Sequence, residues 1–183
     1  MTSPPNLPLD WSHAVGEIPR EGLRVVRTAT GQEAARLGAT LDVLSCESLE
    51  VSYHIRPITH GRYRAEGRLT AVLEQSCVVT LAPVRSVVEE PIRVEFWPAD
   101  QLAHSSNVDL EHSVLEGEEV EPIENHRLEI GRIVYEIVSA AIDPYPRAEG
   151  AEFVWAEEGG SEAAQRGHSG PFAALAKWKG SDQ

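Results

Sequence analysis

An alternation of apolar and polar side chains, broken only at Val72, runs through residues 49–56 and 62–74 and limits the fold of this chain more than any other feature. Successive side chains of a β-strand point to opposite faces, so a period of two predicts strands with one buried and one solvated face. Pro57 and Gly61 bracket the link between the two runs, which predicts an antiparallel hairpin. The apolar positions are Leu49, Val51, Tyr53 and Ile55, then Tyr63, Ala65, Gly67, Leu69, Ala71 and Leu73.

Further strands are expected on both sides of this hairpin. Residues 77–81 are apolar and β-branched and predict a third strand. Residues 92–96 alternate and predict a fourth, with Pro91 at its start or at a sheet edge. Short strands are expected at 11–15 and 23–26. Short links between neighbouring strands favour an antiparallel meander, either open or closed like a barrel.

One long amphipathic helix is predicted over residues 130–142. Its apolar residues recur at offsets 0, 3, 4, 7, 8 and 11, which places them in one stripe. Asp143-Pro144-Tyr145-Pro146 ends the helix, because proline cannot continue its hydrogen bonds. Burial of five large aliphatic side chains would contribute about 7–15 kcal/mol before entropy. The stripe consists of Ile130, Ile133, Val134, Ile137, Val138 and Ala141.

Two shorter helices complete the expected fold. Thr30 and Glu33 have the spacing of a capping box, which predicts a helix over 30–37. Pro171 suits the first turn of a helix over 171–179, with Phe172 and Trp178 on one side. The fold class is therefore α+β. Residues 1–155 form the expected single domain, with an acidic loop at 98–126, and 156–183 form a flexible tail.

The charge distribution limits the function. The net charge is −13, and all of this excess falls within residues 71–183. So acidic a chain does not suit a nonspecific RNA coat protein. Arg62, Arg64 and Arg68 nevertheless share one face of a predicted strand and could hold a phosphate backbone or an acidic partner. The alternative is that they face water and pair with nearby glutamates, which is the more frequent fate of exposed strand charges.

Catalysis and metal binding have weak support. The chain lacks the nucleophile-elbow, P-loop, dinucleotide-binding and zinc-protease motifs. The loop 98–126 carries eight acidic residues with His104, His112 and His126, but its spacing does not fit an EF-hand. A metal-dependent hydrolase using this loop stays as an alternative hypothesis. We expect no metal, no cofactor and no small-molecule substrate.

Three segments resemble motifs of the YceD-type large ribosomal RNA subunit accumulation protein family. The first is residues 72–83, which contain Cys77, Thr80 and Pro83. The second combines residues 129–136, which contain Gly131, with residues 143–147, which contain Pro144 and Pro146. The third is the Pro-Phe-Ala segment that begins at Pro171. The three occur in the order and spacing of the family.

The resemblance implies a non-enzymatic ribosome-biogenesis factor that contacts precursor ribosomal RNA, a basic ribosomal protein, or both. Many members carry Cys-x-x-Cys where this chain has Cys77-Val-Val-Thr80, so zinc or redox use is doubtful and a packing role for Cys77 is favoured. Structural roles are also expected for Thr80, Pro83, Gly131, Pro144 and Pro146. A further alternative is a protein-interaction module that uses the C-terminal helix with Phe172 and Trp178. No signal peptide or membrane span is recognisable, so a cytoplasmic location is expected.

Overall fold

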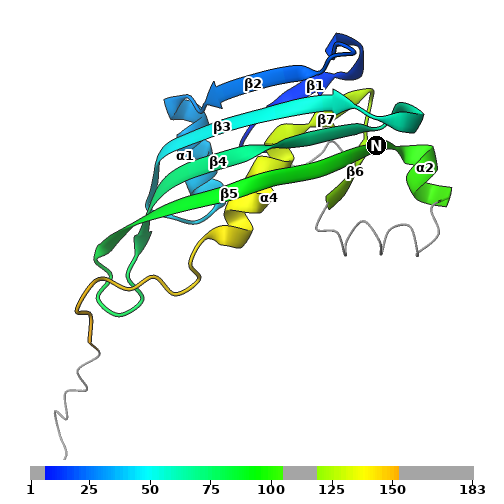
Figure 1. The fold of residues 1–183 in the computed structure, drawn as a ribbon. Coiled ribbons are helices and arrows are strands. Elements are labelled where there is room, and N and C mark those ends of the chain that lie inside the picture. The colour runs from blue at the N-terminus through cyan, green and yellow to red at the C-terminus, as the bar shows by residue number, and fades with distance from the viewer. Residues whose placement is uncertain (1–6, 105–118, 153–183) are drawn as a thin grey trace, which may run out of the picture. The chain divides into compact units, whose positions relative to one another are not determined.

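The computed structural model describes residues 7–104 and 119–152 (Figure 1). The chain divides into two compact units, Met1–Ala151 and Glu152–Gln183, and the elements below all belong to the first. The predicted C-terminal helix, with Phe172 and Trp178, lies outside the described residues. The domain boundary near residue 155 therefore stays a prediction.

A five-stranded sheet in the order β2-β3-β4-β5-β6 forms the main layer. The first four strands are antiparallel to their neighbours, and β6 is parallel to β5. The predicted hairpin of β3 and β4 is confirmed, with Tyr53 opposite Gly67. The strands are β2 Leu23–Thr28, β3 Ser45–Pro57, β4 Tyr63–Ser76, β5 Pro83–Pro98 and β6 Glu119–Ile123.

The predicted α+β class is confirmed, but three details of the sheet differ from expectation. Among the described residues β2 and β6 are its two edges, so the sheet does not close into a barrel. The predicted third strand at residues 77–81 is wrong, because the chain reverses there to bring β5 back along β4. The predicted irregular loop at 98–126 contains helix α2, Ala99–His104, and strand β6.

The helices α1, Gly31–Thr40, and α4, Ile130–Ala141, lie against one face of the sheet (Figure 1). The stripe predicted for α4 is confirmed, since Ile130, Ile133, Val134 and Val138 are all buried. A small two-stranded sheet packs on this side, with β1, Ser12–Ala14, paired to β7, Arg127–Glu129. Single 3₁₀ turns follow β1 at Val15–Glu17 and β3 at Thr59–Gly61.

The capping box of α1 is confirmed and extends into a buried hub. Glu33 accepts the backbone N–H of Thr30 at 2.8 Å, while its own N–H donates to the Thr30 hydroxyl at 3.3 Å. The indole of Trp11, which is wholly buried, donates to Glu33 at 2.7 Å. Arg27 pairs with the same carboxylate at 3.1 Å and lies over the Trp11 ring. One carboxylate thus joins the helix start, β2 and the N-terminal segment.

Replacement of Glu33 by glutamine is expected to reduce the loss of stability in acid. Burial alone raises the pKa of Glu33, but the N–H of Thr30, the indole of Trp11, the Thr30 hydroxyl and Arg27 together lower it from 4.5 to about 2. The stabilisation is therefore present above about pH 4.5 and is lost as the pH falls through about 2. Urea unfolding across this range should show a shallower fall in the free energy of unfolding for Glu33→Gln.

The matched control is Glu50→Gln, which removes the same charge from an exposed position on β3. This variant should keep the acid dependence of the parent protein. Identical acid profiles for Glu33→Gln and the parent would contradict the proposed role of the Glu33 hub.

Candidate nucleic-acid interface

The face of the sheet opposite α1 and α4 carries the candidate interface. Six arginines gather toward the end of this face where β4 begins, and we call them the arginine face: Arg24, Arg56, Arg62, Arg64, Arg68 and Arg93. Strand alternation places them there, because the odd-numbered neighbours in β3 and β4, such as Leu49, Ile55, Ala65 and Leu69, are buried on the other face. No labelled element covers this face in Figure 1.

Part of the arginine face is a fixed, partly buried network. Arg64 donates to Glu95 through Nε at 3.0 Å and through an Nη at 2.6 Å. Glu95 is buried and also accepts the indole N–H of Trp97 at 2.8 Å. Arg62 lies over the Trp97 ring, 3.4 Å from its centre, and donates to Gln101 at 2.8 Å. These two arginines therefore belong to the scaffold of the face.

The other part is exposed and open. Arg24, Arg68 and Arg93 are exposed, and within residues 7–104 and 119–152 no hydrogen bond or ion pair holds their side chains. Arg56 is also exposed and forms an ion pair with Glu66. The register places Arg24 opposite His54, His54 opposite Glu66 and Glu66 opposite Arg93. Free guanidinium groups of this kind suit phosphate oxygens, which they can contact in pairs.

The charge of this face is opposite to that of the chain. The six arginines stand against two carboxylates, Glu66 and Glu95, in a chain whose net charge is −13. The next cross-strand row contains Glu50 and Glu89, which bound the positive area toward the far end of the strands. The positive field is therefore local, and an anion would be directed to one end of the sheet.

The three arginines predicted from the sequence have different environments. Arg68 is free, whereas Arg62 and Arg64 are held by Trp97, Gln101 and Glu95. The alternative of pairing with nearby glutamates is found for Arg64, which pairs with Glu95; Arg56, outside the predicted three, pairs with Glu66. Sequence reasoning missed Arg24 and Arg93, which only the register of β2 and β5 brings to this face. The polar place of Arg93 in the alternation of residues 92–96 was a usable signal.

A second feature lies at the opposite end of β4, where the structure joins two of the family-like segments. The turn that contains Cys77 and Thr80 contacts the segment that contains Pro144 and Pro146, and we call the two segments together the motif turn. The N–H of Val78 donates to the carbonyl of Pro146 at 2.9 Å, and Gln75 donates to the carbonyl of Asp143 at 2.8 Å. Pro83 begins β5 directly after the turn. Cys77, Thr80, Pro83, Pro144 and Pro146 thus serve one local structure.

Cys77 is the centre of the motif turn. Its sulfur accepts the backbone N–H groups of Ala148 at 3.3 Å and of Val79 and Thr80 at 3.4 Å. The side chain is buried. The N–H of Ala148 and the Thr80 hydroxyl are the main causes that lower the pKa of Cys77 from 9.0 to about 6. Thr80 therefore contributes to the hydrogen bonds that hold the Cys77 sulfur.

Replacement of Cys77 by alanine is expected to remove a pH-dependent part of the stability. The thiol has a lowered pKa in the folded chain, so its contribution is complete above pH 9 and is lost as the pH falls through about 6. Chemical unfolding at several pH values should show a weaker pH slope in this range for Cys77→Ala. Cys46→Ala is the control, because burial and Glu47 raise the pKa of Cys46. Parallel slopes for Cys77→Ala and the parent would refute the role of the thiolate.

Gly131, the remaining described motif residue, lies apart from both features. It is the second residue of α4, and its N–H donates to the carbonyl of Trp11 at 2.8 Å. A Cβ at this position would overlap the carbonyl oxygen of Leu9 and would lie 3.0 Å from the nitrogen of Trp11. The lack of a side chain at Gly131 therefore allows the start of α4 to pack against the N-terminal segment.

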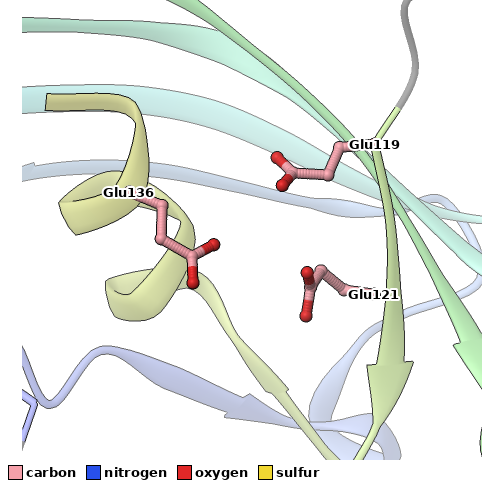
Figure 2. A group of neighbouring side chains, drawn as sticks. All are labelled: Glu119, Glu121 and Glu136. Atoms are coloured by element: carbon pink, nitrogen blue, oxygen red, sulfur yellow. The ribbon is translucent and has the colours of Figure 1, made fainter. Parts of the chain in front are cut away.

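Glu119 and Glu121 of β6 point toward Glu136 of α4 (Figure 2). One carboxylate oxygen from each lies within 4.8 Å of the others. Arg132 pairs with Glu121 at 3.3 Å and with Glu136 at 2.9 Å. Burial raises the pKa of Glu119 and Glu121, and Glu136 adds to the rise by repulsion. Arg132 thus supplies compensating charge to Glu121 and Glu136, and the three residues form an ion-pair network between β6 and α4.

The alternative of a metal-dependent hydrolase depended on the loop 98–126, of which residues 105–118 are outside the described ranges. His112 lies between residues 105 and 118, and His104 is the last residue of α2. His126 is exposed in the turn between β6 and β7, where its carbonyl accepts the N–H of Val15.

Of the described helices, none is long and apolar enough to span a membrane.

The chain was compared with known proteins and protein families. Neither a curated protein nor a solved structure matches the chain. Residues 65–179 match the family model described as large ribosomal RNA subunit accumulation protein YceD. This range starts in β4 and includes the motif turn, Gly131 and α4. It covers more than half of the sequence, so the chain belongs to the large ribosomal RNA subunit accumulation protein YceD family.

Proposed function

We propose that this protein is a non-enzymatic ribosome-biogenesis factor that binds precursor ribosomal RNA through the arginine face. The family description points to accumulation of large-subunit ribosomal RNA. The observation that carries the proposal is a group of three arginines, Arg24, Arg68 and Arg93, which are exposed and unpaired among the described residues and share one sheet face of an acidic chain. We place this activity in the cytoplasm.

Both the positive charge of the arginine face and the negative charge of the remaining chain should direct the binding of RNA. Contacts between arginine and phosphate release counterions and supply most of the affinity for RNA. The negative charge elsewhere on the chain repels RNA and confines binding to one end of the sheet. The network of Arg62, Arg64, Glu95 and Trp97 keeps the strand ends rigid, so little order has to be gained on binding.

The proposal is tested in cells from which the protein has been removed. We expect less large-subunit than small-subunit ribosomal RNA, and restoration of the balance by the unaltered chain. The double variant Arg68→Glu/Arg93→Glu should be produced at a normal level and should fail to restore it. The protein should also sediment with large-subunit precursors. Full restoration by the double variant, or absence from every precursor fraction, would count against the proposal.

A basic ribosomal protein is a second candidate partner, favoured by a groove on the other side of the molecule. The groove has a volume of about 690 Å³, with Leu9, Phe96 and Tyr135 among its apolar lining residues. Five carboxylates line it, against two arginines: Asp10, Glu121, Glu124, Glu129 and Glu136. A lysine- and arginine-rich segment would complement this charge.

This second candidate is tested with Asp10→Asn/Glu124→Gln, which neutralises two exposed carboxylates of the groove. Purified large-subunit ribosomal proteins are titrated one at a time, with binding followed by fluorescence anisotropy. A partner that binds the parent and loses affinity for this variant would support the groove. Equal affinity for both, with RNA binding unchanged, would leave RNA as the partner.

A further inference from the structure

We propose, on the basis of the RNA-binding function above, that the arginine face binds the two backbones of an RNA double helix and not the bases of a single strand. This deepens the proposed function, because it names the form of RNA that the face accepts. Two independent observations lead to it: within residues 7–104 and 119–152 this face presents no exposed Phe, Tyr or Trp ring, and its free arginines are spread across the strands.

Single-strand binders depend on aromatic side chains on which bases stack, each worth about 1–3 kcal/mol. On the arginine face, the aromatic ring of Trp97 is covered and cannot accept a stacked base. Trp97 is 5% exposed, and the guanidinium of Arg62 lies 3.4 Å above its ring. Tyr53 is buried on the opposite face, where its hydroxyl bonds to His13. Among the described residues of this face, the half-buried imidazole of His54 is the ring that remains for a single strand to stack on.

The one large exposed aromatic residue among the described residues is Tyr145. It belongs to the Pro144–Pro146 segment of the motif turn, which contacts the turn that follows Ser76 at the far end of β4. Arg68 is eight residues away from Ser76 on this strand, which corresponds to about 26 Å at the rise of an extended chain. A base stacked on Tyr145 would therefore be remote from the free arginines.

The free arginines also lie too far apart across the sheet for one strand of RNA that follows the β-strands. Arg24 on β2 and Arg93 on β5 belong to one cross-strand row, separated by His54 and Glu66. Three strand spacings correspond to about 14 Å. Positive charge thus occurs at two borders of the row, and a carboxylate lies between them. Two backbones that flank a groove match this pattern better than one continuous backbone.

The residues between the borders fit the shallow minor groove of an RNA helix. Ser52 lies between Val26 and Arg68 in the adjacent row, and Thr70 follows in the next row. Both are half-buried, so their hydroxyls lie near the surface of the sheet. Double-stranded RNA is recognised mainly through phosphates and 2′-hydroxyls across this groove. Serine and threonine can donate to a 2′-hydroxyl and accept from it.

The test uses the full chain with an RNA duplex of about 16 base pairs, near the span of known duplex-binding domains. The comparison probe is the pyrimidine strand of the same duplex, which does not pair with itself. We expect the duplex to bind about tenfold more tightly than the strand, a free-energy difference of about 1.4 kcal/mol. Arg24→Glu should weaken duplex binding and leave single-strand binding nearly unchanged, because only a duplex reaches both borders.

The outcomes separate this inference from the proposed function. Equal or tighter binding of the pyrimidine strand, abolished by Arg68→Glu/Arg93→Glu, would overturn the duplex inference and leave RNA binding intact. Binding of neither probe would overturn both. Duplex binding that survives Arg24→Glu and the double variant would place the RNA elsewhere on the molecule and overturn the assignment to this face.

Discussion

The double variant Arg68→Glu/Arg93→Glu is expected to lose RNA affinity by at least about tenfold and to bind with a weaker dependence on salt. Both arginines are exposed and free among the described residues, so their reversal removes two contacts without breaking any internal bond. Each phosphate contact contributes about 0.7–0.9 to the slope of log affinity against log salt, so the slope should fall in magnitude by about two. Fluorescence anisotropy with labelled RNA at several salt concentrations measures both effects.

The matched control is Arg36→Glu/Arg147→Glu, which makes the same change in net charge. Both of these arginines are exposed, one on α1 and the other beside the motif turn. The control should keep the parent's salt slope and lose little affinity. Circular dichroism should show that both double variants are folded. If the two variants weaken binding equally, total charge and not the arginine face governs RNA binding, and the proposed interface is wrong.

Gly131→Ala is expected to lower the free energy of unfolding by about 3 kcal/mol, a cost at the upper end for an added methyl group in a packed interior. Inside a helix the same substitution normally stabilises by about 1 kcal/mol, so the sign is informative. Here the new methyl group would overlap the carbonyl of Leu9. Leu9 and Trp11 are buried and their backbone cannot move aside freely. The displacement should also weaken the bond from Trp11 to Glu33.

Gly31→Ala is the matched control for this prediction. Gly31 is the first residue of α1, and no atom lies within 4 Å of a Cβ placed there. Its replacement should leave stability unchanged or slightly higher, as judged by urea unfolding of both variants. A neutral or stabilising Gly131→Ala would show that the start of α4 does not pack tightly against the N-terminal segment.

The parts of the fold that the sequence predicted correctly are those encoded by neighbouring residues. The alternation in residues 49–56 and 62–74 was sufficient for the hairpin of β3 and β4, because the link between them is short. The capping residues Thr30 and Glu33 marked the start of α1, and the spacing of α4's apolar residues marked its buried face. In each case the signal and the structure lie in the same short segment.

Residues 77–81 show why the remaining parts could not be predicted. Apolar, β-branched side chains indicated a strand, but Val78 and Leu81 are exposed in a turn. The turn is held by hydrogen bonds to Cys77 from Ala148, about seventy residues later, and by the bond from Val78 to Pro146. No local pattern encodes such distant partners. The parallel pairing of β6 with β5 depends in the same way on contacts across a long connection.

The candidate interface likewise has one part that the sequence predicts and another that depends on the tertiary structure. Period-two alternation determined by itself that Arg64 and Arg68 share one face of a strand, since side chains two positions apart always point the same way. Only the tertiary structure decided which arginines are free. Register brought Glu95 to Arg64, Trp97 under Arg62 and Arg93 to the same face from another strand. Cross-strand pairing joins residues that are distant in the chain. The sequence alone therefore placed Arg64 and Arg68 on one strand face, whereas the sheet determined which arginines together form the exposed surface.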